Sequence, residues 1–434
     1  MFTQLLTSDP IQPSLLPADV CVQLPQGQLL GAPNASVKLI FSNWSGIARL
    51  KTGQIGALAE DYVEGKLQLE GAMRDVMRVM SRVLTGSPLE SDTHWWMGLI
   101  RRARSLGAHT LKKDAAQVQF HYDVSDAFYA LWLGPRQIYS CAYYQDLLNP
   151  SITLAKAQEA KLDHICRKLM LKRGERFLDI GAGWGALLLW AAEHYGVDAT
   201  GITLSKNQYA HVQQLIDKKG LSHRVRIELR DYRHMEIGSN DKPFEKISSV
   251  GMFEHVGHAN MTAYFSKIMA LLVPGGLFMN HSITAGGLEN RQLGAGMGDF
   301  IEKYIFPGGE LRHVSVLLAH IARAGLEMVD AENLRPHYAR TLWDWSNALE
   351  KKLDEARDIL MLDRNRDLAE KTLRAYRLYL AGSAMSFEQG WLSLHQLLAT
   401  RPTGDVSSAP VKGAQSVYPF NRDYMYNQIH QGLG

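Results

Sequence analysis

The chain has 434 residues, of which 46% are hydrophobic and 21% are charged, and its formal net charge is +3. This length is enough for two domains of a globular protein. The weak net charge, without a stripe of Lys and Arg interleaved with aromatic residues, argues against nucleic acid as a partner. The three cysteines are odd in number and lack metal-type spacing, which disfavours a disulfide framework and a metal site and indicates the cytoplasm. No apolar run approaches the roughly 20 residues that span a bilayer, so any lipid contact is expected to be peripheral.

Residues 1–86 are predicted to form a small α+β domain. Residues 37–41, 49–50 and 65–71 have the composition or alternation of strands, and residues 72–84 have the apolar spacing of an amphipathic helix. The phrase DYVEGKLQLEG, which ends with the third of these strands, resembles the sterol-carrier-like lipid-binding fold. The alternative is a capping domain that binds no ligand.

Residues 87–118 are predicted to connect this domain to the rest of the chain. A cluster of basic residues there is either a solvated face or a contact for anionic lipid headgroups. The cluster consists of Arg101, Arg102, Arg104, Lys112 and Lys113.

From about residue 150 onward, strands and helices alternate, which predicts a doubly wound α/β sheet with its ligand at the carboxyl ends of the strands. A helical region at about 338–387 interrupts the last pair of strands, and its position suggests a lid over the ligand. Residues 403–434 are predicted to form a loose tail. The predicted strands are residues 176–179, 199–204, 225–230, 246–250, 277–281, 327–333 and 391–399.

Residues 177–185 read FLDIGAGWG and lead directly into a helical pattern. A strand, a glycine loop and the start of a helix let the backbone approach a nucleotide closely. The spacing G-x-G-x-G differs from the G-x-G-x-x-G of dinucleotide folds and favours S-adenosylmethionine as the cofactor. Asp179 is expected to accept a hydrogen bond from the ammonium of this cofactor. The loop residues expected to hold the cofactor are Gly181, Gly183, Trp184 and Gly185.

The ends of the next two strands complete the predicted cofactor site. Many such folds place an acidic residue about 20 positions after the glycine loop to hold the ribose. None stands there in this chain, so Thr203 and Gln208 are expected to serve instead. At the end of the third strand, Asp231 is expected to accept from the adenine amino group, and Tyr232 to pack on the base.

Four further motifs occur in order: HYD at 121–123, YSCAY at 139–143, GMFEHVG at 251–257 and YIFPGG at 304–309. Together they resemble cyclopropane fatty acid synthases. The resemblance implies a Rossmann-like class I methyltransferase domain, at residues 119–402, that transfers a methylene group from S-adenosylmethionine to a cis double bond in an acyl chain. It also implies action on unsaturated membrane phospholipids, peripheral association with the inner face of the membrane, and a homodimer.

In that family, methyl transfer leaves a carbocation on the acyl chain, and a bound bicarbonate is positioned to remove the proton whose loss closes the ring. The positions that match its ligands are Cys141, Glu254, His281, the backbone of Ile283, and Tyr338. Tyr139 and Ser140 match positions that hold the methionine end of the cofactor. Aromatic rings can stabilise a cation through their faces. The candidates for that role are Phe253, Tyr304, Phe306 and Tyr338.

Two positions depart from the family pattern. Ala182 stands where many members carry a cysteine in the glycine loop, and Ser383 stands where a cysteine was once regarded as catalytic. A covalent thiolate route at residue 383 is therefore excluded, whereas the bicarbonate route is unaffected.

Three alternatives to cyclopropanation stay open. Loss of a different proton would give a methylene-branched chain, and its reduction would give a methyl branch. Methylation of a small amine or hydroxyl compound is the second alternative, although it needs no bicarbonate site. The third is a non-catalytic lipid-binding protein built on the N-terminal domain.

Overall fold

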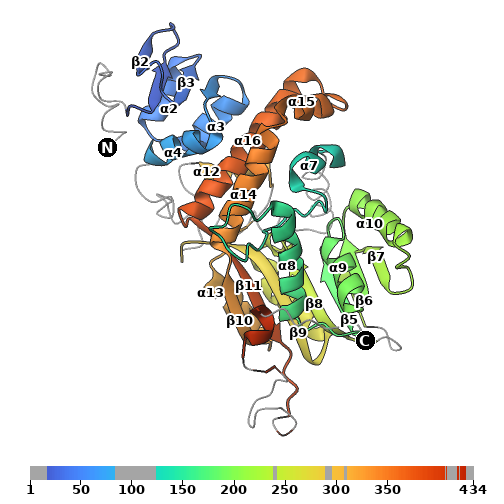
Figure 1. The fold of residues 1–434 in the computed structure, drawn as a ribbon. Coiled ribbons are helices and arrows are strands. Elements are labelled where there is room, and N and C mark those ends of the chain that lie inside the picture. The colour runs from blue at the N-terminus through green and yellow to red at the C-terminus, as the bar shows by residue number, and fades with distance from the viewer. Residues whose placement is uncertain are drawn as a thin grey trace.

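The computed structural model describes residues 17–83, 124–237, 242–288, 296–306, 310–405, 407, 418–419 and 421–426. The chain forms a small N-terminal α+β unit and a large α/β unit, which Figure 1 shows above and below one another. The basic cluster of the predicted connector, the HYD motif and the PGG part of the YIFPGG motif lie outside the described residues. Within the described residues, no helix combines the length and apolar character needed to cross a bilayer.

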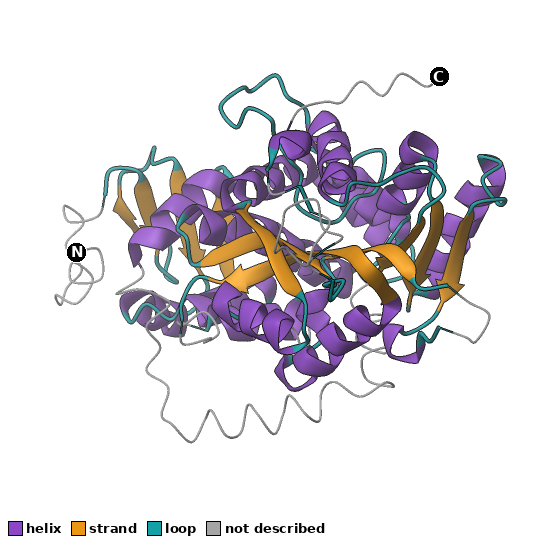
Figure 2. Ribbon diagram, turned by 90° about the horizontal axis from the view of Figure 1, so that it is seen from below, coloured by secondary structure: helices purple, strands orange, loops and turns teal. Residues whose placement is uncertain are grey.

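The large unit is built on a seven-stranded sheet with the order β10-β11-β9-β8-β5-β6-β7. Strands β5 to β9 run parallel, whereas β11 is antiparallel to both β9 and β10. This is the doubly wound sheet that the sequence predicts, and Figure 2 shows helices on both of its faces. The strands are β5 (Arg176–Ile180), β6 (Asp198–Thr203), β7 (Val225–Leu229), β8 (Phe244–Val250), β9 (Leu272–Ala285), β10 (Glu327–Asn333) and β11 (Leu392–Thr400).

Helices connect the strands and cover the sheet. Some begin at a side-chain cap: Thr153 and Ser205 cap α8 and α10 by accepting a backbone hydrogen bond from the first turn. The helices of this unit outside the insertion are α7 (Asp126–Leu133), α8 (Leu154–Lys168), α9 (Ala186–Tyr195), α10 (Lys206–Lys218), α11 (Met261–Leu271), α12 (Met297–Tyr304), α13 (Val314–Arg323) and α17 (Asp423–Tyr426), with short 3-10 turns at Tyr232–His234, Phe253–His255 and His258–Asn260.

Three helices are inserted between β10 and β11: α14 (Arg335–Glu350), α15 (Leu353–Met361) and α16 (Arg366–Glu388). Figure 1 shows them rising from one end of the sheet toward the N-terminal unit. The sequence predicts a helical interruption at this place in the chain. The buried faces of α14 and α16 pack in one hydrophobic core with α7 and with the N-terminal helices.

The N-terminal unit is a four-stranded sheet, β2-β1-β3-β4, and its described residues also form helices α2, α3 and α4. One sequence prediction here is wrong, because Arg49 and Leu50 lie in α2 and not in a strand. Asn43 caps this helix by accepting from Gly46 N–H, and Ile47 and Leu50, three residues apart, are both buried on one face. The elements are β1 (Val20–Gln23), β2 (Leu29–Gly31), β3 (Val37–Phe41), α2 (Trp44–Lys51), α3 (Ile55–Val63), β4 (Leu67–Glu70) and α4 (Met73–Val83).

The N-terminal unit packs directly on the inserted helices. Gly56 in α3 lies so close to the start of α12 that a Cβ atom there would come within 2.2 Å of the Gly296 carbonyl oxygen. Arg377 of α16 donates to Tyr62 Oη at 2.7 Å and forms a bidentate ion pair with Glu350 of α14. The N-terminal unit therefore stabilises the helices that cover one end of the sheet.

Candidate active site

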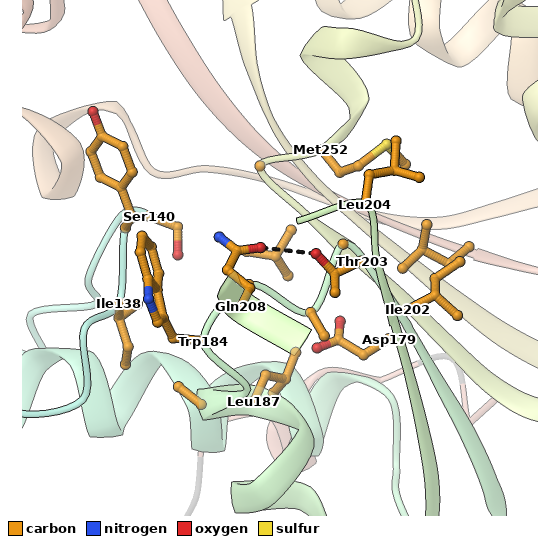
Figure 3. Close-up of a pocket in the computed structure, with 18 of the residues that line it drawn as sticks. Ile138, Ser140, Asp179, Trp184, Leu187, Ile202, Thr203, Leu204, Gln208 and Met252 are labelled. Carbon is orange, nitrogen blue, oxygen red and sulfur yellow. Dashed lines mark hydrogen bonds between the residues drawn. The ribbon is translucent and has the colours of Figure 1, made fainter. Parts of the chain in front are cut away.

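A pocket opens at the carboxyl ends of β5, β6 and β7, where a doubly wound sheet binds its ligand. Ten residues that the sequence assigns to the cofactor line it, whereas Gly185 is not among its lining residues. The ten are Tyr139, Ser140, Asp179, Gly181, Gly183, Trp184, Thr203, Gln208, Asp231 and Tyr232. Figure 3 labels Ser140, Asp179, Trp184, Thr203 and Gln208 of this set.

The glycines of the loop have different roles. Gly183 has φ +55° and nothing within 4 Å of an added Cβ, so its missing side chain leaves space in the pocket. Gly185 has φ +80°, precedes α9, and would bring a Cβ within 2.9 Å of Val212 in α10. Gly185 therefore allows close packing of the loop against α10, and its contact with the cofactor stays a prediction. The N–H groups of Gly181 and Ala182 both donate to Ile202 O and so hold the loop on β6.

Asp179 is only 2% exposed and accepts a 2.6 Å hydrogen bond from Ser248 Oγ on β8. Burial raises the pKa of its carboxyl to about 6, although Ser248 and the ammonium of Lys161 act against that rise. A cation bound beside Asp179 would lower the pKa of its carboxyl and so keep it ionised. This environment suits the predicted contact with the ammonium of S-adenosylmethionine.

Gln208 and Thr203 are joined by a hydrogen bond of 2.9 Å, in which the Thr203 hydroxyl donates to Oε1 of Gln208 (Figure 3). The same hydroxyl accepts from the N–H of Ser205. This arrangement leaves Nε2 of Gln208 buried and without a hydrogen-bond partner among the described residues. An unsatisfied buried donor in a pocket indicates a place for a ligand acceptor.

Asp231, the predicted acceptor for the adenine amino group, already has a partner in this structure. Its carboxylate is engaged on both oxygens by the side chain of Arg233, at 2.7 and 3.0 Å, and also accepts from the Arg233 backbone. Burial alone would raise the pKa of Asp231, but these hydrogen bonds hold it below its ordinary value. Tyr232 lines the pocket and packs edge-on against Tyr264 with ring centroids 5.1 Å apart.

The five residues predicted to hold bicarbonate do not line this pocket but lie close to one another beside it. Glu254 Oε1 accepts from Ile283 N–H at 2.7 Å. His281 lies two residues before Ile283 on β9, so both side chains are on one face. The Ile283 N–H is therefore already used by Glu254, whereas the predicted role of the Ile283 backbone as a bicarbonate ligand stays a prediction.

The other two predicted ligands, Cys141 and Tyr338, lie near Ile283 at the start of α14. Leu394 of β11 pairs with Ile283, and its carbonyl accepts from Leu334 N–H just before α14. Cys141 Sγ lies 4.0 Å from Leu334 O, and Tyr338 is one turn further along the helix. Cys141, Tyr338 and Ile283 accordingly belong to one hydrophobic cluster.

Burial controls the charges of this group. It raises the pKa of Glu254 to about 7, depresses that of His281 well below its ordinary value, and raises that of the Cys141 thiol. Glu254 can thus hold a proton near neutral pH, His281 is neutral, and Cys141 is an unreactive thiol. Glu254 Oε2 and His281 Nε2 are buried without hydrogen-bond partners among the described residues.

These two atoms fit a small oxyanion such as bicarbonate. A protonated Glu254 can donate from Oε2, and His281 can donate from Nε2 when the Gln396 amide, 3.2 Å away, donates to Nδ1. Tyr338 adds a phenol as a further donor. An anion that accepts from these groups would satisfy the two buried polar atoms.

The raised pKa of Glu254 has a measurable effect on stability. Its ordinary value is 4.5, so between pH 4.5 and 7 the folded protein keeps a proton that the unfolded chain has lost, and stability falls as the pH rises through this window. Glu254→Gln removes this cost, and its stability relative to the wild type should grow by about 2 to 3 kcal/mol between pH 5 and pH 8. Denaturant unfolding at both pH values checks this, and parallel pH curves for the two proteins would contradict it.

The predicted cation-stabilising aromatics do not act as one group. Phe253 packs 5.4 Å from Tyr264 and 5.3 Å from Phe265, in a different hydrophobic cluster from the one that holds Cys141 and Tyr338. Tyr304, Phe306 and Tyr338 do pack against that cluster. Phe253 is therefore a core residue in this fold.

Sequence reasoning missed a larger aromatic group around Tyr139. The rings of Tyr129, Trp132 and Trp345 lie 5.4 to 5.6 Å from that of Tyr139. Trp184 of the glycine loop lies 5.4 Å from Tyr129, which links this group to the cofactor pocket. Helical patterning alone makes these residues resemble ordinary core positions, because they come from helices far apart in the chain.

The sequence profile of the family described as "Mycolic acid cyclopropane synthetase" matches residues 109–397. The chain belongs to this family. The predicted resemblance is therefore confirmed for the large unit, whereas the N-terminal unit precedes the matched residues.

Relatives agree with this assignment. A "Probable fatty acid methyltransferase" of Pseudomonas putida is 42% identical, over 86% of this chain and 89% of its own length. The solved structure of the cyclopropane synthase MmaA2 from Mycobacterium tuberculosis is 34% identical with a TM-score of 0.59 and covers 66% of this chain and 98% of its own. The mycolic acid cyclopropane synthase CmaA1, solved with SAH and CTAB, is 35% identical with a TM-score of 0.59 and the same coverage. Membership makes this protein an S-adenosylmethionine-dependent methyltransferase of a family that modifies fatty or mycolic acids.

Proposed function

We propose that this enzyme converts a cis double bond in the acyl chain of a membrane phospholipid into a cyclopropane ring, with S-adenosylmethionine as the methylene donor and bicarbonate as a second cofactor. The observation that carries the proposal is the pair of buried, unpartnered polar atoms, Glu254 Oε2 and His281 Nε2, beside the cofactor pocket. Methyl transfer to nitrogen or oxygen gives no reason for a buried oxyanion site of this kind.

An alkene is a weak nucleophile, so the enzyme must hold it in line with the sulfonium methyl group in a site without water. Cys141, Leu334 and Tyr338 are buried in one hydrophobic cluster and would keep water from an acyl chain held beside them. The rings of Tyr338 and Tyr304 would face the carbocation that forms on the chain. When bound, bicarbonate would supply the base for the proton lost from the transferred methyl group. Glu254, His281 and Tyr338 would hold that anion and fix its orientation.

The rival outcome is a methylene-branched chain from the same site. It is favoured by the name of the Pseudomonas putida relative, a "Probable fatty acid methyltransferase", which does not specify a ring. The two outcomes differ in which carbon loses the proton, and a displacement of the base by about 1 Å is enough to change a reaction of this kind.

The test uses purified protein with S-adenosylmethionine, bicarbonate and vesicles of cis-unsaturated phospholipid. Hydrolysed acyl chains should be heavier by one CH2 and show upfield ring-methylene protons by NMR. Olefinic methylene signals at the same mass would support the branching rival. An unchanged mass with bound cofactor would exclude the phospholipid acyl chain as the acceptor.

We further propose that the enzyme meets this substrate from the cytoplasm as a peripheral protein at the inner face of the membrane, and that the N-terminal unit assists docking. The homodimer stays a prediction. The contact of α3 and α4 with the inserted helices means that deleting residues 1–86 would also expose the core face of α16. Vesicle binding by point variants on the outer surface of the N-terminal unit is therefore the sharper test of docking.

A further inference from the structure

Lys161 is a buried lysine of the cofactor pocket that no motif indicated. It lies on α8, is only 2% exposed, and lines the pocket. Its ammonium donates to Ser140 Oγ at 2.8 Å. One turn earlier on the same helix, Gln158 donates to Ser140 O at 2.9 Å. Helix α8 thus fixes both the backbone and the hydroxyl of Ser140.

Among the described residues, Lys161 has no carboxylate within ion-pair distance. Lys168 provides the contrast, because it is fully buried on the same helix but pairs with Glu332 and with Asp330. A buried cation without a counter-ion is costly. Burial accordingly lowers the pKa of Lys161 to about 8. The free-energy cost of this buried ammonium is offset if a bound ligand supplies a negative charge beside it.

Two other hydrogen-bond donors lie in the same part of the pocket. Since the Ser140 hydroxyl accepts from Lys161, its own hydrogen is available to a ligand. Gln208 Nε2 is buried without a partner among the described residues, and Figure 3 shows this amide nitrogen turned toward Ser140, so the present inference replaces the ribose role predicted for Gln208. Lys161, Ser140 and Gln208 thus offer three donors in this part of the pocket, which suits a carboxylate.

We propose that Lys161 is the counter-ion of the α-carboxylate of S-adenosylmethionine, with Ser140 and Gln208 as its hydrogen-bonding neighbours. This inference rests on the cofactor assigned above and not on the fate of the acyl chain. Asp179 and Lys161 would then recognise opposite charges at the same end of the cofactor. The alternative ligand for the Lys161 ammonium is bicarbonate, because the charge of Lys161 also lowers the pKa values of Cys141 and His281. The hydrogen bond from Lys161 to Ser140 and the position of Lys161 in the pocket wall favour the cofactor carboxylate over bicarbonate.

The test compares Lys161→Met with wild type by calorimetric titration of S-adenosylmethionine and of its decarboxylated analogue. The variant should bind S-adenosylmethionine at least tenfold more weakly. It should bind the decarboxylated analogue as tightly as wild type or more tightly, because a cation is removed from beside a ligand with no negative charge. Lys156→Met, the same change at an exposed position of α8, is the matched control and should alter neither affinity.

Three results would overturn the proposal. They are an unchanged affinity of Lys161→Met for S-adenosylmethionine, an equal loss for both ligands, or an unchanged cofactor affinity with a lost response of turnover to bicarbonate. Lys161→Gln, which can still donate to Ser140, provides a second neutral variant if the methionine variant does not fold. Failure of the wild type to bind S-adenosylmethionine would instead reject the cofactor assignment itself.

Discussion

Glu254→Gln should reduce turnover by about 100-fold or more while leaving the affinity for S-adenosylmethionine unchanged. Glutamine keeps an Oε1 acceptor for the Ile283 N–H, so the loop after β8 should keep its place. It loses the ionisable oxygen, which is buried without a partner and which we assign to the bicarbonate site. Steady-state rates on phospholipid vesicles and calorimetric titration of the cofactor give the two quantities.

Glu310→Gln is the matched control for this experiment. Glu310 lies beside the same loop, where its N–H donates to Glu254 O and its carboxylate accepts from His258 N–H at 2.8 Å. Its substitution should change the rate little, since glutamine also accepts from a backbone N–H. Equal losses in the two variants would show that loop geometry, and not the chemistry of Glu254, limits turnover.

Gly183→Leu should weaken cofactor binding by about 100-fold or more. Gly183 has φ +55° and borders the pocket, so a leucine there combines backbone strain of about 1 to 3 kcal/mol with a side chain in the space of the ligand. Calorimetric titration of S-adenosylmethionine measures the loss, and far-ultraviolet circular dichroism checks that the variant is folded.

Strain and obstruction can be separated with a second glycine. Gly174 has φ +82°, also with nothing within 4 Å of an added Cβ, and it does not line the pocket. Gly174→Leu should therefore lower the melting temperature but retain affinity for the cofactor. A normal affinity in folded Gly183→Leu would show that the cofactor lies elsewhere than in this pocket.

The local patterns of the sequence determined the sheet and its glycine loop. The strand–glycine–helix pattern at residues 177–185 can form only one kind of local structure, and the alternation of strands and helices leads to a doubly wound sheet. The same patterns located the polar residues at the strand ends, because a residue that follows a parallel strand must lie at the ligand edge. The helix around Arg49 was missed, since a short apolar pair satisfies both periodicities.

The tertiary structure alone decided which side chains are available to a ligand. Arg233 donates to the carboxylate of Asp231, and Glu254 accepts from the Ile283 N–H. Val212 packs so close to residue 185 that only glycine fits there. The spacing of residues in the sequence cannot show these contacts. The role proposed for Lys161 depends on a buried ammonium with no carboxylate within ion-pair distance among the described residues, and that situation is set by every element packed around it. The sequence thus determined where the site lies, whereas hydrogen bonds and burial between distant segments determined which of its groups can act on a ligand.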